Sequence, residues 1–125
     1  MTRETFTTDR IATPVGPFSP AVRAGEFVYL SGQVAQDPAT GRLIDGDATA
    51  QTEQIFANLE AVLRAAGKTL ADVVRAGVFL TDMTDYAAMN AVYARHFEAP
   101  YPARTAIAVA ALPLGAAVEI DIVAR

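Results

Sequence analysis

Residues 101–124 read YPARTAIAVAALPLGAAVEIDIVA, and this stretch decides the class of fold. Residues 103–111 and 116–124 are rich in strand-forming and small apolar residues, and Leu-Pro-Leu-Gly at 112–115 predicts a turn between two strands. The apolar side chains of the second strand alternate between two faces: Val118, Ile120 and Ile122 on one, Ala117 and Val123 on the other. A strand that is apolar on both faces needs a cover on both sides.

Two more strands are expected earlier in the chain. Residues 26–36, EFVYLSGQVAQ, predict a strand with a kink or bulge at Gly32. Residues 74–80 predict another strand, with one face made by Val74, Ala76, Val78 and Leu80. The segment 13–20, with three prolines, predicts an ordered loop.

Two helices are expected between these strands. In residues 48–66 apolar side chains recur at helical spacing, and Asp47 or Thr49 can cap the start of the helix. The second helix is expected from Asp82 or Thr84 to about Phe97. Its apolar face would carry Tyr86, Met89, Tyr93 and Phe97.

The alternation of strands and helices along the chain predicts an α+β sandwich of a four- to six-stranded sheet with both helices on one face. Two helices cover only one face of such a sheet. The other face would expose a large apolar patch unless it meets another subunit. The sequence therefore predicts an oligomer.

Composition narrows the classes of function. With 125 residues and 52 % hydrophobic residues, the chain is expected to form one domain, residues 1–125. No apolar run approaches the ~20 residues of a membrane helix, and the N-terminus is polar, so we expect a cytoplasmic protein without a membrane partner. The net charge of −4 and the absence of a visible basic patch disfavour nucleic acid as a partner.

The inventory of reactive groups is short. Cysteine is absent and His96 is the one histidine, which excludes thiolate nucleophiles and makes a zinc site improbable. Lys68 is the one lysine. Catalysis would have to use arginine, carboxylates, hydroxyls, amides and water. We expect a structural role for His96, near the end of its helix.

Arg104 is the most informative candidate. Its neighbours on the same strand face would be Ala106, Ala108 and Ala110, and such small residues leave space in front of a guanidinium that can grip a carboxylate. The alternative is an edge arginine paired with a surface acid.

Glu119 and Asp121 share a face of the last strand. If residues 103–111 and 116–124 form a hairpin, that face could lie near Arg104. A carboxylate there is either half of a structural ion pair or a base that orients water. Ser31 and Asn90 are either ligand-binding polar groups or ordinary hydrogen-bonding and solvated residues.

Five stretches together resemble the reactive intermediate deaminase family, RidA, also called YjgF. They span nearly the whole chain: GPFSPAV (16–22), YLSGQVA (29–35), QTEQIFANLEAVLRAAG (51–67), VVRAGVFLTDMTDYAAMNAVYARHF (73–97) and YPARTAIAVAALPLGAAVEIDIVA (101–124). The last is the most specific, with its Pro-x-Arg, Ala-Leu-Pro and apolar-Glu-apolar strand. Thr105 is a less usual residue after the arginine.

The resemblance implies a chorismate-mutase-like α+β fold of the bacillus type, with a mixed sheet and two helices on one face. It implies a homotrimer with a closed, β-barrel-like central core and active sites in clefts between subunits. Family members hydrolyse enamines and imines, such as 2-aminoacrylate, to 2-keto acids and ammonia. They use no metal and no organic cofactor.

The resemblance also implies roles for single residues. Arg104 matches the arginine that grips the substrate carboxylate, and Glu119 matches the glutamate near the attacking water. Ser31 and Asn90 match polar positions of the cleft. Two positions depart from the family pattern: Phe18 replaces the usual tyrosine, and Ala106 replaces a cysteine whose backbone matters more than its thiol.

Two other functions compete with hydrolysis. A sensor or scaffold trimer would bind a keto acid in the same pocket without turnover, and the missing hydroxyl at Phe18 favours it. Endoribonuclease activity is attributed to some relatives. The net negative charge and the small number of His, Cys and Lys side chains argue against it here.

Overall fold

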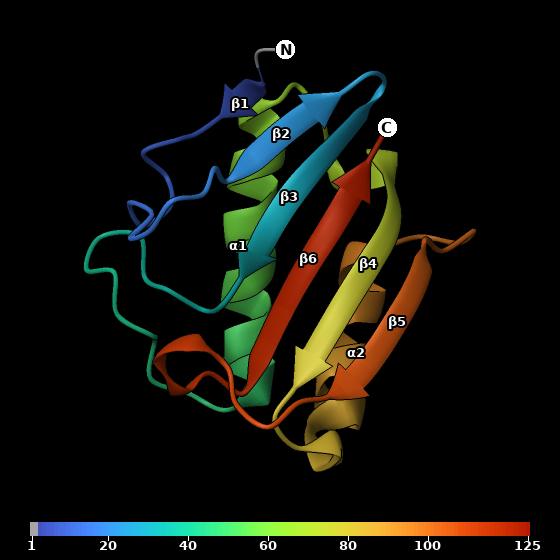
Figure 1. The fold of residues 1–125 in the computed structure, drawn as a ribbon. Helices are drawn as coiled ribbons and strands as arrows, with labels where there is room; N and C mark the ends of the chain where they lie inside the picture. The colour runs from blue at the N-terminus through green and yellow to red at the C-terminus, as the bar shows by residue number, and fades with distance from the viewer. Residues whose placement is uncertain (1–2) are drawn as a thin grey trace.

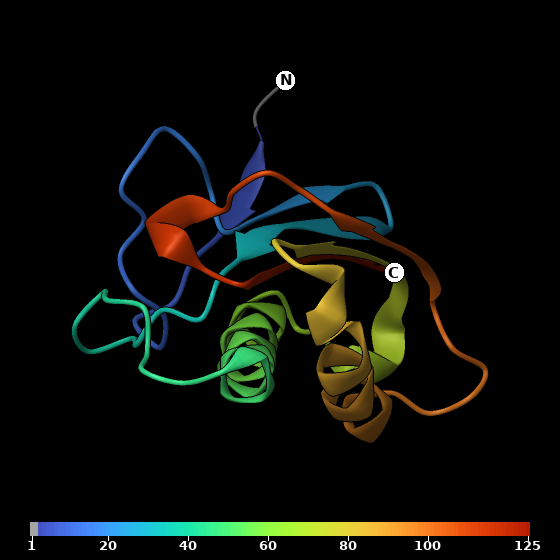
Figure 2. The same ribbon diagram turned by 90° about the horizontal axis from the view of Figure 1, so that it is seen from below.

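The structure, a computed structural model, describes residues 3–125, which form a mixed six-stranded sheet with two helices on one face (Figures 1 and 2). The predicted α+β class is confirmed. Three strands and one long helix come first: β1 (Glu4–Phe6), β2 (Ala21–Ala24), β3 (Phe27–Gln33) and α1 (Ala48–Ala65). The remaining elements are β4 (Val73–Leu80), α2 (Tyr86–His96), β5 (Ala103–Ala108) and β6 (Val118–Ala124).

Helix α1 lies within one residue of its predicted bounds because its end signals are strong. Asp47 caps it, with Oδ1 accepting from the Ala50 backbone N–H at 3.0 Å. Gly67 follows the helix at a φ of 75°, a conformation that glycine adopts without strain. The buried face of α1, which includes Ile55, Phe56 and Leu59, packs against the sheet.

Helix α2 begins later than expected. Asp82 caps a short 3₁₀ turn, Met83–Asp85, by accepting from the Thr84 N–H at 2.9 Å, and the α-helix follows from Tyr86. Met89, Tyr93 and Phe97 are buried as predicted, whereas Tyr86 is only partly buried at the edge of the sheet.

The order of the strands is β1-β2-β3-β6-β4-β5. Strand β6 lies between β3 and β4 and is antiparallel to both, whereas β5 runs parallel to β4 at the edge. The predicted hairpin of the last two strands is therefore wrong. The chain leaves β5 and crosses the end of β4, where Val109 N donates to Leu80 O and Thr81 N donates to Ala117 O. Residues 109–117 are thus a crossover and not a tight turn.

Two register shifts change which side chains face the core. The shift between Leu30 and Gln33 confirms the bulge expected around Gly32. The shift between Val73 and Arg75 corrects the prediction for β4: Val73 enters the core, and Val74 is 42 % exposed on the other side. An extra residue in a strand reverses the alternation before it, and the sequence pattern does not mark it.

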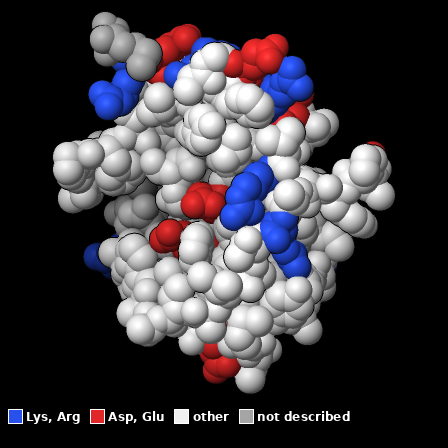
Figure 3. All heavy atoms as spheres, turned by 45° about the vertical axis from the view of Figure 1, so that its right-hand side comes forward, with Lys and Arg blue, Asp and Glu red and all other residues white. Residues whose placement is uncertain are grey.

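The second face of the sheet is not covered by either helix, as the arrangement of the layers shows (Figure 2). Tyr29 is 50 % exposed there and Ile107 is 45 % exposed. Charged side chains lie in the middle of an otherwise mostly uncharged surface (Figure 3). This is the face for which the sequence predicts a second subunit, and the oligomer stays a prediction. Neither helix within residues 3–125 has the length and apolar character needed to cross a membrane.

Candidate functional site

Arg104 projects from β5 toward α2, and two side chains of α2 hold its guanidinium. Its Nη1 donates to Asn90 Oδ1 at 2.8 Å, and its Nη2 donates to the Tyr86 hydroxyl at 2.9 Å. The guanidinium carbon also lies 4.7 Å from the ring centroid of Tyr93. The space expected in front of Arg104 is thus partly filled by α2, and the planar group has a fixed orientation.

Tyr86 and Tyr93 belong to the cluster around Arg104. The sequence predicts both tyrosines on the apolar face of the helix. Tyr86, Asn90 and Tyr93 are four and three residues apart, so one helix face presents all three to Arg104. That spacing, read for polar atoms instead of for hydrophobicity, is the signal that could have found them.

The charge of Arg104 also affects the pKa values of Tyr86 and Tyr93. The interaction with Asn90, followed by the Arg104 charge, lowers the pKa of Tyr86 below its ordinary value. Burial raises the pKa of Tyr93, and Arg104 opposes that shift. The Tyr93 hydroxyl is buried without a hydrogen-bond partner among the described residues. Buried hydroxyls usually have a hydrogen-bond partner, so the Tyr93 hydroxyl is a candidate to bind a water or a polar ligand.

Glu119 lies in a different place, on the face of β6 that points away from the helices. Val118, Ile120 and Ile122 are buried toward α1 and α2, so alternation turns Glu119 and Asp121 to the open face. Within one chain, Arg104 and Glu119 therefore lie on opposite faces of the sheet. The predicted proximity of the two is wrong for a single chain.

The Glu119 carboxylate helps to line a cavity of about 440 Å³ with Phe18, Gly32 and Leu114. A Cβ added at Gly32 would lie 2.6 Å from Glu119 Oε2, so a larger residue here would displace the carboxylate from its present position. Burial, and to a smaller extent the neighbouring Asp121, raises the pKa of Glu119. A carboxylate of this kind binds a proton more readily than one on the surface.

Ser31 holds the loop that carries Phe18. Its Oγ donates to Ser19 O at 2.6 Å, and its backbone N–H donates to Pro20 O at 2.9 Å. This fixes the Pro-rich loop against β3 at the edge of the Glu119 cavity. In the single chain Ser31 is a positioning residue for Phe18, which is 53 % exposed.

Ala106 shares the face of Arg104, partly buried against the core, and pairs in register with Val78. The predicted site residues thus form two groups. Arg104, Asn90 and Ala106 lie at the β5–α2 edge. Phe18 and Glu119 line the cavity on the other face, and Ser31 holds the loop that carries Phe18.

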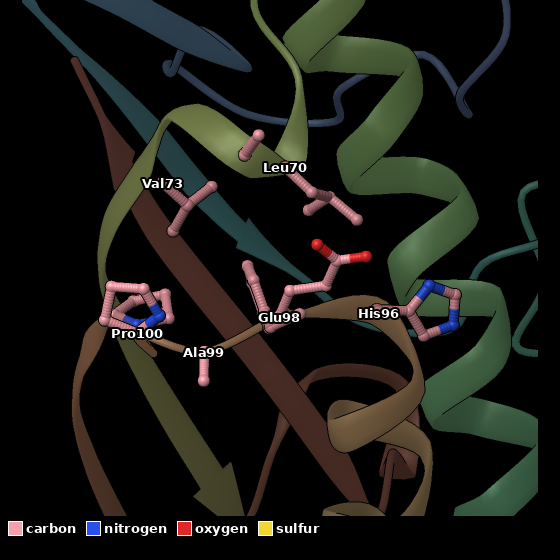
Figure 4. Close-up of a pocket in the computed structure, with 9 residues that line it drawn as sticks. Leu70, Val73, His96, Glu98, Ala99 and Pro100 are labelled. Atoms are coloured by element: carbon pink, nitrogen blue, oxygen red, sulfur yellow. The ribbon is translucent and has the colours of Figure 1, made fainter.

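A separate hollow of about 500 Å³ lies at the other end of α2 (Figure 4). Leu70, Val73, Ala99 and Pro100 line it, and the Glu98 carboxylate points into it. Its histidine, His96, stacks on Phe56 with ring centroids 4.3 Å apart and has Nε2 3.0 Å from Glu53 Oε2. These contacts join α2 to α1, which is the structural role expected for His96.

Known proteins share the sequence pattern and the fold of this chain. The family model described as endoribonuclease L-PSP matches residues 7–125. The chain belongs to this family, the RidA/YjgF family. RidA from the Antarctic bacterium Psychrobacter sp. PAMC 21119 has 46 % sequence identity and a TM-score of 0.94, with 98 % of this chain and 99 % of that chain covered.

Two further members of the RidA family bear on function. A 2-iminobutanoate/2-iminopropanoate deaminase of Capra hircus is 40 % identical over 99 % of this chain and 90 % of its own length. The structure of E. coli TdcF with bound serine has 34 % identity and a TM-score of 0.90, with 97 % of each chain covered. The family thus includes a protein named as an imine deaminase and one that binds a small amino acid.

Proposed function

We propose that the protein is a hydrolytic deaminase that converts reactive enamine and imine carboxylates, such as 2-aminoacrylate, to 2-keto acids and ammonia without a cofactor. The observation that carries the proposal is the fixed guanidinium at the β5–α2 edge. Arginine has five N–H donors, and Arg104 uses two of them on Asn90 and Tyr86. The remaining donors suit a small carboxylate, which accepts two parallel hydrogen bonds.

The proposed site is completed by a second copy of the chain. Arg104 and Glu119 face opposite sides of one sheet, so one copy supplies the Arg104 edge and its neighbour supplies the Glu119 cavity. The family resemblance implies three copies, and a closed ring of three would give each copy one neighbour on each side and cover the open face of the sheet. The proposal therefore includes a homotrimer with active sites between subunits.

The chemistry needs a positioned water and a group that exchanges protons. An enamine first becomes the imine by moving a proton from nitrogen to its terminal carbon. Water then adds to the carbon of the C=N bond, and Glu119 accepts the proton that the water loses. Glu119 returns this proton to the nitrogen, which gives a carbinolamine with one hydroxyl and one amino group on the same carbon. The hydroxyl proton then moves through Glu119 to the amino nitrogen, the C–N bond breaks as the C=O bond forms, and the products are ammonia and the keto acid. The raised pKa of Glu119 suits it to both transfers.

The test is the release of ammonia and keto acid from 2-aminoacrylate generated in situ, with semicarbazide as a competing trap. Acceleration over the uncatalysed reaction, lost in Arg104→Ala, supports the deaminase. Keto acid binding without acceleration would favour the sensor or scaffold, which the missing hydroxyl at Phe18 makes the second candidate. RNA cleavage that persists in Arg104→Ala would point to a different site.

A further inference from the structure

The rim of the Glu119 cavity is apolar and exposed. Val15 is 93 % exposed, Phe18 is 53 % exposed and Leu114 is 57 % exposed, and all three line this one cavity. Glu119 is its one charged lining residue within residues 3–125. Single exposed apolar residues are ordinary, but three large ones around one cavity indicate a surface that is covered by something apolar.

Leu114 gives the strongest indication, because its backbone is strained. It has a φ of 60° and a ψ of 16°, and it is the one non-glycine residue with positive φ among residues 3–125. The Gly115 N–H donates to Leu112 O, so Leu114 is the third residue of a turn with Pro113 second. Glycine or asparagine adopts this conformation at the third position easily, whereas leucine does not.

Packing in the core does not compensate for this strain, since Leu114 is more than half exposed. The strained residue instead presents four carbon atoms at the rim of the cavity, opposite the loop that carries Phe18. Strained residues that core packing does not explain occur mainly at functional sites.

We propose that Val15, Phe18 and Leu114 select substrates with a bulky apolar side chain, such as the imines of leucine or phenylalanine, over the small 2-aminoacrylate. This inference rests on the proposed deaminase function and names its substrate class. With the substrate carboxylate on Arg104 and the reacting carbon at Glu119, the side chain of the substrate lies against the rim. Each methylene removed from water there raises kcat/KM roughly fourfold.

The experiment generates imines in situ from alanine, leucine and phenylalanine with an amino acid oxidase, and measures kcat/KM for each. The parent should prefer the leucine and phenylalanine imines to the alanine imine by roughly tenfold or more. Leu114→Gly relieves the backbone strain and removes the side chain, so it should fold at least as well as the parent. We expect it to lower the ratio of kcat/KM for the leucine imine to that for the alanine imine about tenfold.

Two further variants sharpen the test. Phe18→Tyr adds a hydroxyl that a bulky apolar side chain leaves unpaired, so it should favour the alanine imine. Met83→Gln is the control, because Met83 is 46 % exposed and lies outside the cavity. It should leave all ratios unchanged.

The outcomes are distinguishable. Parent activity on the alanine imine without a preference for bulky imines would overturn the rim proposal and leave the deaminase intact. The rim proposal is also overturned, with the deaminase intact, if Leu114→Gly and Phe18→Tyr change kcat/KM equally for every substrate. A parent that accelerates none of the imines would overturn both.

Discussion

The Arg104 guanidinium and the Glu119 carboxylate owe their properties to different surroundings. Hydrogen bonds to Asn90 and Tyr86 fix the orientation of Arg104. Partial burial raises the pKa of Glu119. In the proposed mechanism, the first residue binds the substrate carboxylate and the second exchanges a proton.

At Arg104, we expect Arg104→Ala to lower kcat/KM for 2-aminoacrylate by about 100-fold or more, since it removes two hydrogen bonds to a charged group and each contributes about 1.5–3 kcal/mol. Arg104→Lys keeps the charge but loses the planar fork, so it should restore activity only in part. Arg64→Ala, at an exposed arginine of α1, is the matched control. Unchanged turnover in Arg104→Ala would remove the carboxylate-binding role.

At Glu119, we expect Glu119→Gln to lower kcat about 100-fold, within the usual range for general acid–base groups, and to preserve the binding of a keto acid. Glu98→Gln, in the hollow of Figure 4, should have no such effect. Equal losses in both variants would show that the effect is not specific to Glu119.

The raised pKa of Glu119 also predicts how stability depends on pH. The folded state holds the proton more tightly than the unfolded state, whose pKa is near the ordinary 4.5. The contribution of Glu119 is therefore most favourable below that value, and it is lost as the pH rises through the folded pKa. Glu119→Gln should flatten this part of the stability profile, as thermal unfolding between acid and neutral pH would show. A profile equal to that of the parent would contradict the burial of this charge.

Among the elements, the bulge of β3 sets the position of Glu119. The register shift between Leu30 and Gln33 brings Gly32 against the side chain of the facing strand β6. The missing side chain at Gly32 leaves the space that Glu119 occupies. This strand irregularity therefore belongs to the candidate site.

Gly32→Ala should place a methyl group against Glu119 Oε2 and destabilise the fold by about 1–3 kcal/mol. The same substitution in a Glu119→Ala background should cost far less, because the group that clashes is gone. Chemical denaturation of the four proteins of this cycle measures the coupling. Additive effects would show that Gly32 acts independently of Glu119.

For the molecule as a whole, we predict that the subunits assemble through the open face of the sheet. We expect light scattering at micromolar concentration to give three times the chain mass of 13.2 kDa. Ile107→Asp, on the open face of β5, should yield smaller species and lose imine hydrolysis. Met83→Asp changes a residue of almost equal exposure and should stay trimeric. A folded, fully active monomer would overturn both the trimer and the proposal of a site between subunits.

Features that depend on nearby residues could be predicted from the sequence, whereas features that depend on distant residues could not. Helix α1 could be predicted because Asp47, its periodic apolar residues and Gly67 all act within a few residues of each other. The place of β6 in the sheet could not be predicted, because the alternation of Val118, Ile120 and Ile122 fits a strand beside β5 as well as one between β3 and β4. Val74 was misplaced because the bulge in β4 arises from pairing with β6 and leaves no mark in the local pattern.

By itself, the sequence determined the α+β class, both helices and the short inventory from which Arg104 and Glu119 stand out, since hydrophobic periodicity and residue chemistry are local properties. Only the tertiary structure decided that β5 pairs with β4, that Tyr86 and Asn90 fix Arg104, and that Glu119 faces the opposite side of the sheet. These depend on contacts between segments far apart in the chain. Their geometry is set by how the whole sheet packs, and no single segment encodes it.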